Sequence, residues 1–292
     1  MTKRRKGPRP ERASQPKPRD VYVPRPFEGL ADEAEWIALR ELVPAASAPL
    51  RLAPAVAERY GDRPLVLATV LPLAWPAMTK PDGRVFIALQ RHAESGDPSR
   101  DLAVALLCGL EATPGEPVEV PALPGPGPRL QDLLADGALD VTVHDGFSFW
   151  LDPDETEDPN VKASLDRANA QIFPSVRMAA ARAAYWCRLP GQAHVRWVLP
   201  DDEDAALDAL SRLSAAGVLT LGEGTRFAGM FRAHGRLVPV WDLPTGLEAG
   251  EWEAPLTEFA KRYAEALAGG APLTSAERRS RQGLLGRQKT LR

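Results

Sequence analysis

Three short segments have glycine spacings close to those of phosphate-binding or catalytic motifs. Residues 283–290 have the span of a phosphate-binding loop, but Gln288 stands where the second glycine is required, and no strand is expected before it. Residues 222–224 follow a predicted strand, but Phe227 replaces the third glycine of the dinucleotide-binding motif. Residues 146–150 have tryptophan where a nucleophile elbow needs glycine. None of these segments predicts a nucleotide site or a serine hydrolase.

The residue types that bind metals or transfer protons form no recognisable motif along the chain. Carboxylates crowd residues 152–158, where oxygen ligands could attract a hard cation, but the segment lacks the glycine and the final glutamate of an EF-hand loop. We favour a solvated loop whose last residue, Asp158, caps the next helix. The four histidines are scattered, and Cys108 and Cys187 form no CxxC pair. We therefore predict no catalytic residue, metal site or cofactor, although an active site built from residues distant in sequence stays open.

The composition is typical of a globular protein with room for two structural units. The chain has 292 residues, of which 44% are hydrophobic and 26% are charged. Its apolar runs are shorter than the roughly 20 residues that a membrane-spanning helix needs, and no apolar segment follows the N-terminal cations. We expect neither a membrane span nor secretion, and two cysteines without a pairing pattern favour a reducing cytoplasm.

Basic residues are concentrated at the two ends of the chain. The net charge is −3, yet residues 1–25 and 271–292 are both strongly basic, so the region between them is acidic. Such segregation predicts contacts of the ends with a polyanion or with the acidic surface of the protein itself, and solvated tails are the plain alternative. The candidate polyanion contacts are Lys3, Arg4, Arg5, Lys6, Arg278, Arg279, Arg281, Arg287 and Lys289.

The distribution of proline, charge and apolar residues divides the chain into four regions. Residues 1–26 combine prolines and cations with almost no large apolar side chain, so we expect a disordered basic tail. Residues 27–151 form a first module, which includes a Pro-rich linker at 114–128. Residues 152–270 form a second module that ends in a docking helix. Residues 271–292 form an exposed basic helix or tail, because few apolar side chains are available to bury.

Local signals in the first module predict two long helices and several strands. Asp32 and Glu35 have the spacing of a capping box and predict a helix that ends before Pro44. Asp97 followed by Pro98 predicts the start of a second helix. Strands are predicted near residues 48–53, 64–71 and 84–90, and a hairpin is predicted from strands 139–143 and 147–151 around Asp145-Gly146.

The second module repeats this order of elements. Asp158 and Pro159 begin a helix that ends at Pro174, and the acids at 201–204 begin another that ends at Gly217. Strands are predicted near residues 175–181, 184–189, 194–199, 218–221, 226–232 and 236–241. The repeat predicts an α+β protein of two related modules, each with the order helix, three strands, helix, two or three strands, in mainly antiparallel sheets backed by helices.

Four tryptophans fall on predicted strands, where they could fill the core or form a protein-recognition surface. We favour the core, because the chain has few other aromatic side chains to fill it. The four residues are Trp150, Trp186, Trp197 and Trp241.

The chain resembles an uncharacterised actinobacterial family known only as a domain of unknown function. The resemblance covers about residues 24–270 and implies no activity. More loosely, the order of elements is similar to that of type III secretion chaperones, and this similarity implies protein binding and dimer-like pairing of modules. The segments that carry the family resemblance are PFEGL (26–30), EWIALRELVPAA (35–46), AYWCR (184–188) and RWVLP (196–200).

The sequence leaves two main hypotheses for function. The first is a non-enzymatic protein-binding or adaptor protein built from a duplicated chaperone-like module, whose partner is unidentified. The second is a nucleic-acid-binding or ribosome-associated factor whose basic ends neutralise phosphates, which would make its binding depend steeply on salt.

Overall fold

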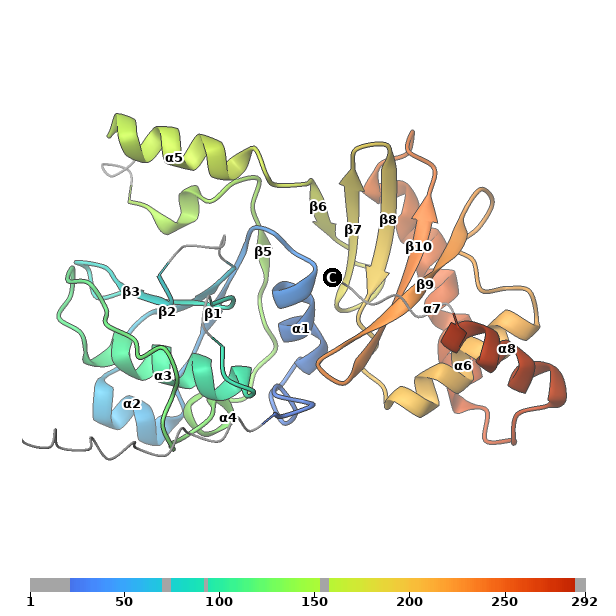
Figure 1. The fold of residues 1–292 in the computed structure, drawn as a ribbon, viewed down its shortest axis with the longest axis horizontal. Helices are drawn as coiled ribbons and strands as arrows, with labels where there is room; N and C mark the ends of the chain where they lie inside the picture. Colours follow the sequence, from blue (N-terminus) through green and yellow to red (C-terminus); the bar gives the residue numbers. More distant parts are fainter. Residues whose placement is uncertain (1–21, 70–74, 92–93, 153–157, 287–292) are drawn as a thin grey trace, which may run out of the picture.

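The chain folds into two five-stranded sheets that lie side by side, with one helix between them (Figure 1). The computed structural model describes residues 22–69, 75–91, 94–152 and 158–286. The helix between the sheets is α1 (Glu33–Glu41). The predicted α+β class with mostly antiparallel sheets is confirmed. No helix in the described parts of the chain is long and apolar enough to cross a membrane.

The first sheet has the strand order β3-β4-β2-β1-β5. Strands β2 and β4 run parallel and the other neighbours run antiparallel. Helix α3 covers one face, while a 3-10 turn and α5 lie over the other, where their side chains share a small core with β4. The elements are β1 (Ala46–Leu50), α2 (Pro54–Tyr60), β2 (Leu65–Ala68), β3 (Ala77–Thr79), β4 (Val85–Ala88), α3 (Pro98–Glu111), α4 (Leu130–Leu133), β5 (Thr142–Val143), the 3-10 turn (Ser148–Trp150) and α5 (Pro159–Asn169).

The hairpin predicted around Asp145-Gly146 is wrong. Residues 142–143 pair with β1 instead, and residues 148–150 form the 3-10 turn. The reason is burial: Phe147 and Trp150 enter the small core over β4, and the indole N–H of Trp150 donates to the Thr69 carbonyl at 3.0 Å. Apolar burial outweighs the local turn signal here. Helix α2 and strand β3 were not predicted.

The second sheet is fully antiparallel, with the strand order β6-β7-β8-β10-β9. Helices α6 and α7 cover one face, and α8 packs on α6. The strand predicted near 218–221 is a loop. The elements are β6 (Ser175–Arg177), β7 (Ala184–Leu189), β8 (Gln192–Trp197), α6 (Glu203–Ala215), β9 (Arg226–Ala233), β10 (Arg236–Leu243), a 3-10 turn (Ala249–Trp252), α7 (Glu253–Ala268) and α8 (Ser275–Gly286).

The two sheets do not have the same topology, and the predicted duplication is not confirmed. In the first sheet the third strand in sequence lies at an edge and the second and fourth strands pair in parallel. In the second sheet the first three strands are neighbours in sequence order and the last two form a hairpin. A similar order of helices and strands along the chain therefore conceals two different patterns of strand pairing.

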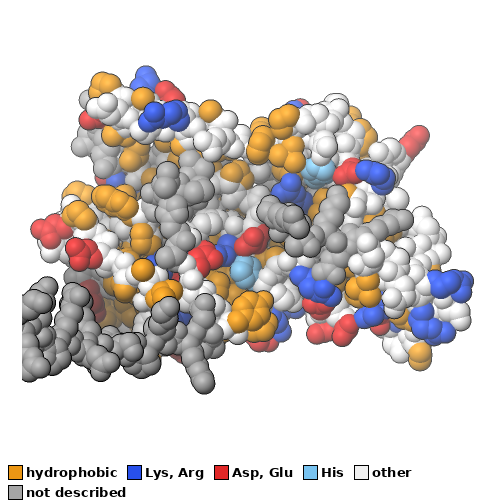
Figure 2. Space-filling model, in the orientation of Figure 1, with side chains coloured by type: hydrophobic (Ala, Val, Ile, Leu, Met, Phe, Trp, Pro, Cys, Tyr) orange, Lys and Arg blue, Asp and Glu red, His pale blue; other side chains and the backbone are white. Residues whose placement is uncertain are grey.

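Helix α1 packs against both sheets. Its Trp36, Ile37 and Leu39 belong to the core of the first sheet, and the same core includes Tyr185 and Phe231 of the second sheet. Polar contacts surround this apolar junction, and Figure 2 shows acidic, basic and histidine side chains meeting where the two halves adjoin. The pairs across the junction are Asp32–Arg182, Glu33–Arg236, Glu35–Arg177, Glu35–Tyr185 and Glu41–His234.

Two expectations about the start of α1 need correction. Asp32 makes no side-chain cap, because its backbone is left-handed and its carboxylate accepts instead from the Leu139 N–H and from Arg182. The segment 22–26, which we assigned to the disordered tail, is placed on the body. The Val23 backbone N–H donates to the Gly96 carbonyl, and Arg25 forms ion pairs with Glu28 and with Glu33, the first residue of α1.

Candidate ligand-binding site

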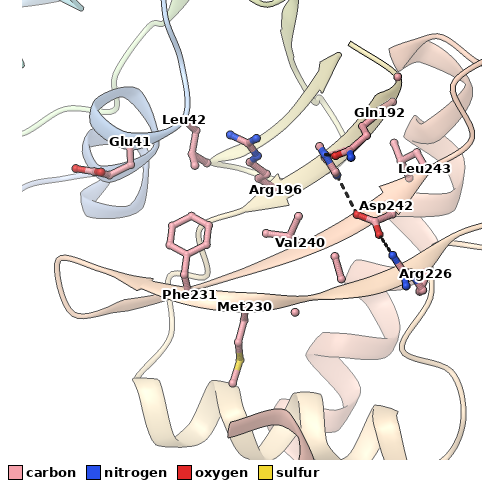
Figure 3. Close-up of a pocket in the computed structure, with 15 residues that line it drawn as sticks. Glu41, Leu42, Gln192, Arg196, Arg226, Met230, Phe231, Val240, Asp242 and Leu243 are labelled. Atoms are coloured by element: carbon pink, nitrogen blue, oxygen red, sulfur yellow. Dashed lines mark hydrogen bonds and ion pairs between the residues drawn. The ribbon is translucent and has the colours of Figure 1, made fainter. Parts of the chain in front are cut away.

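A hollow of about 540 Å³ lies on the face of the second sheet that α6 and α7 leave open, beside the C-terminal end of α1 (Figure 3). This volume is within the range of small-molecule pockets. Strands β8, β10 and β9 form its floor, and α1 and the β7–β8 turn bound its ends. The lining residues are Glu41, Leu42, Gly191, Gln192, Ala193, His194, Arg196, Arg226, Ala228, Gly229, Met230, Phe231, Val240, Asp242 and Leu243.

The hollow exists because the sheet is irregular at this point and its side chains there are small. Gly229 pairs with Val240 but Phe227 pairs with Trp241, so Ala228 is an extra residue in β9. This β-bulge places the two smallest lining side chains of the strand, those of Ala228 and Gly229, next to each other at the hollow. Gly229 has a φ of 139°, a conformation that favours glycine.

A row of polar side chains crosses the sheet at one end of the hollow. The strand register aligns Cys187 of β7, His194 of β8, Asp242 of β10 and Arg226 of β9. Nδ1 of His194 lies 3.1 Å from one carboxylate oxygen of Asp242, and the other oxygen lies 2.5 Å from Arg226. Nε2 of His194 lies 3.2 Å from the side-chain oxygen of Gln192. The Asp242 carboxylate is therefore shared between two basic groups.

Arg196 lies beside this polar row but takes no part in its hydrogen bonds and ion pairs. It lies two residues after His194 on β8, so its side chain rises from the same face of the sheet. Among the residues that the structure describes, none forms a hydrogen bond or ion pair with the Arg196 guanidinium. Figure 3 shows the guanidinium turned toward Leu42, just after α1, and away from the Asp242–Arg226 pair. The hollow thus contains a half-buried cation with which no carboxylate of the described residues forms an ion pair.

The geometry of this site does not favour nucleophilic chemistry at Cys187. Cys187, His194 and Asp242 are the residue types of a thiol nucleophile, its base and an orienting acid, but Cys187 is only 4% exposed. Burial raises the pKa of its thiol, so the reactive thiolate is disfavoured at neutral pH, and the nearby Arg196 offsets this only in part. No group of three or more His, Cys, Asp or Glu in the described ranges could hold a metal ion.

A second polar pair lies on the first sheet, away from the hollow. Ser47 of β1 is 2.8 Å from Nε2 of His144, which follows β5. Burial lowers the pKa of His144 and so favours its neutral form, and Phe149 stacks on its ring at 4.3 Å. The backbone N–H of His144 also donates to the backbone carbonyl of Ala45. These bonds attach the two-residue strand β5 to β1, and we interpret the pair as structural.

The four tryptophans lie inside the protein. Trp150, Trp186, Trp197 and Trp241 are between 0% and 7% exposed. Trp150 fills the small core over β4, and the other three fill the core between the second sheet and α6 and α7. Their rings therefore stabilise the two units rather than forming an exposed surface for a partner.

The structure describes only some of the basic residues that were predicted to contact a polyanion. Lys3, Arg4, Arg5, Lys6, Arg287 and Lys289 lie outside the described residues.

The remaining three residues are on α8, and they differ in whether their guanidinium groups already bind other groups of the protein. Arg281 forms ion pairs with Asp204 at 2.6 Å and Asp208 at 2.8 Å on α6. Arg278 binds the Leu273 carbonyl and Ser275, and Arg279 is exposed. Basic and acidic side chains intermingle on this part of the surface in Figure 2. At Arg281 the acidic body of the protein itself is the partner.

Sequence reasoning did not select the residues that line the hollow. The signal for them is weak: Gln192, His194 and Arg196 are polar residues at alternate positions of β8, and the residues between them are apolar. Such alternation identifies an open sheet face but not what lies across it. The bulge at Ala228 and the alignment of Asp242 with His194 depend on strand pairing, which the sequence does not reveal.

The fold is that of an α+β protein with two unlike sheets and a pocket on the second. The chain belongs to a family of unknown function (DUF5926), whose family model matches residues 26–292. No curated protein and no solved structure matches the chain. The family resemblance seen in the sequence is thus confirmed. The actinobacterial source and the likeness to type III secretion chaperones gain no support from these comparisons.

Proposed function

We propose that the protein is a non-enzymatic binding or adaptor protein that receives a segment of a protein partner in the hollow on the second sheet. The observation that carries this proposal is the hollow itself. Its floor has a β-bulge with small residues, its walls are apolar, and it contains an arginine without a partner among the described residues. A sheet face of this kind offers apolar contact and one charged group that is not already paired, as pockets for partner side chains do.

The apolar walls distinguish this proposal from a polyanion site. Leu42, Phe231, Val240 and Leu243 line the hollow together with the polar row. Nucleic-acid surfaces are instead dominated by cations that reach phosphates. Of the basic residues on α8, Arg281 is already paired with carboxylates of α6. The nucleic-acid or ribosome-associated alternative therefore rests on the charge of the chain ends.

A peptide-display selection tests the proposal. The full chain is used to select peptides from a random 12-residue library, and the selected peptides are titrated against wild type and an Ala228→Leu variant. Ala228→Leu adds side-chain volume to the floor of the hollow. Its control is Ala254→Leu, which makes the same change at an exposed position of α7. Urea unfolding shows whether each variant keeps its fold.

We expect the selected peptides to compete with one another, and to bind the folded Ala228→Leu variant at least about tenfold more weakly than wild type and Ala254→Leu. Failure to select any peptide, or equal binding to both variants, would contradict the proposal. Binding of RNA that survives moderate salt and is lost when residues 1–25 and 271–292 are removed would favour the alternative.

A further inference from the structure

We infer that Arg196 makes the hollow a receptor for an acidic side chain, so that the partner segment inserts an aspartate or glutamate there. The inference rests on the proposed function and adds the chemistry of the recognised group. It begins from the contrast between Arg196 and the other arginines around the junction, such as Arg177, Arg182 and Arg236, which pair with carboxylates of α1 or its N-terminal end.

The groups that face Arg196 leave its charge unbalanced. Glu41 of α1 lines the same hollow, but its carboxylate is 2.9 Å from His234 and 3.4 Å from Arg40. Asp242 of β10 is shared between His194 and Arg226. Phe231 of β9, Val240 of β10 and Leu42, just after α1, are apolar. Tyr185 of β7, which pairs with Arg196 across the strands, donates its hydroxyl to Glu35.

A half-buried guanidinium without a partner loses hydration that only another polar group can replace. Carboxylate fits this role, because its two oxygens match the planar fork of arginine N–H donors. The apolar walls beside Arg196 would then contact neighbouring side chains of the inserted segment. In an extended segment these are two positions away from the acid, because alternate residues share a face.

The position of Arg196 in the sheet favours a side chain over a chain terminus. Strand β8 is the central strand of the second sheet, with β7 on one side and β10 on the other. Because β8 has a neighbouring strand on each side, a carboxylate approaches Arg196 from the open face of the sheet. A glutamate or aspartate in the middle of a segment has a side-chain stem for this approach.

The test uses the selected peptides and their changed forms against Arg196→Gln and wild type. In the peptides, each acidic residue is replaced by its amide, Glu by Gln or Asp by Asn, and separately the C-terminal carboxylate is amidated. Arg196→Lys keeps the positive charge but loses the planar pair of N–H donors. Arg167→Gln on α5 is the control for loss of a cation elsewhere. Urea unfolding again reports the integrity of each variant.

We expect one acidic position per peptide whose amide form binds wild type about 10- to 100-fold more weakly, the range for a charge-assisted hydrogen bond. Arg196→Gln should weaken the acidic peptide by a similar factor and should abolish the difference between acid and amide, because the two changes remove the same contact. Arg196→Lys should recover part of the affinity, and Arg167→Gln should change nothing.

The outcomes separate this inference from the proposed function. Peptides that are sensitive to Ala228→Leu but indifferent to Arg196→Gln would overturn the inference and leave the binding site standing. Peptides whose affinity depends on the free C-terminus, and not on an acidic side chain, would overturn the choice of a side chain. If no peptide is selected, both fall.

Discussion

The carboxylate of Glu35 on α1 accepts a hydrogen bond of 2.7 Å from the hydroxyl of Tyr185 on β7, and both residues are buried at the junction of the two sheets. The guanidinium of Arg177 on β6 forms an ion pair with the same carboxylate, with an N–O distance of 2.8 Å. A buried charge that depends on groups from the other unit makes separation of the units unfavourable, because the carboxylate would lose its partners. The position of α1, and with it one end of the hollow, is thus tied to the second sheet.

Replacing Glu35 should destabilise the protein strongly. Glu35→Ala leaves Arg177 without its carboxylate and opens a gap beside Tyr185, so we expect a loss of about 3 kcal/mol in the free energy of unfolding. Glu35→Gln should lose less, because the amide oxygen still accepts from Tyr185. Urea denaturation measures both, with Glu28→Gln at an exposed position as the control. Equal stability of Glu35→Ala and wild type would refute the importance of this contact.

Acid should weaken the contacts of Glu33 and Glu41 with the second sheet. Burial alone would raise the pKa of Glu33, but hydrogen bonds from Arg25 and Arg236 outweigh it and hold the pKa below the ordinary 4.5. Burial alone would also raise the pKa of Glu41, but the hydrogen bond with His234 contributes to a pKa below the ordinary value. A carboxyl with a lowered folded-state pKa stabilises the fold above the unfolded-state pKa, and this stability is lost as pH falls through the folded-state pKa.

The free energy of unfolding, measured by urea from pH 7 to pH 3, should therefore fall less steeply below pH 5 in Glu33→Gln and Glu41→Gln than in wild type. Asp101 offers a control of opposite sign, because burial raises its pKa. Its charged form opposes folding, so in Asp101→Asn the fall below pH 5 should be steeper than in wild type. Identical pH profiles for all four proteins would contradict these assignments.

The turn at Gly235 should be less tolerant of a side chain than the similar turn at Gly191. Both glycines have positive φ, 79° and 74°, so alanine is strained at either position. A Cβ at Gly235 would also lie 2.2 Å from Cγ of Arg25, whereas nothing lies within 4 Å at Gly191. We expect Gly235→Ala to lose about 1 kcal/mol more than Gly191→Ala in urea unfolding. Equal losses would show that the segment around Arg25 is not held against this turn.

Helix α8 should detach from the body when its one buried side chain is shortened. Leu284 is 3% exposed and packs in the core of the second unit. Leu284→Ala removes that burial, worth about 2–3 kcal/mol, and leaves the partly buried Leu285 and the ion pairs of Arg281 to hold the helix. We expect faster trypsin cleavage after Arg278 and Arg279 than in wild type or in Gln282→Ala, an exposed control. Unchanged cleavage would contradict docking through Leu284.

Local signals determined several elements correctly. Asp97, Asp158 and Asp202 each accept backbone N–H groups at the start of the helix predicted beside them, and proline follows the first two. These predictions succeed because a cap and its helix lie within a few residues of each other. Alternating or continuous apolar runs likewise located most strands, which established the α+β class.

Tertiary structure alone decided how these elements combine. Nothing near Asp32 in sequence reveals that its carboxylate binds Arg182 instead of capping α1, and Asp145-Gly146 gives no sign that its neighbours are drawn into a core. The candidate site depends on the same kind of information. Whether Arg196 has a partner, and whether Ala228 is an extra residue, depends on the register between strands far apart in sequence, which packing sets and which local propensity does not record.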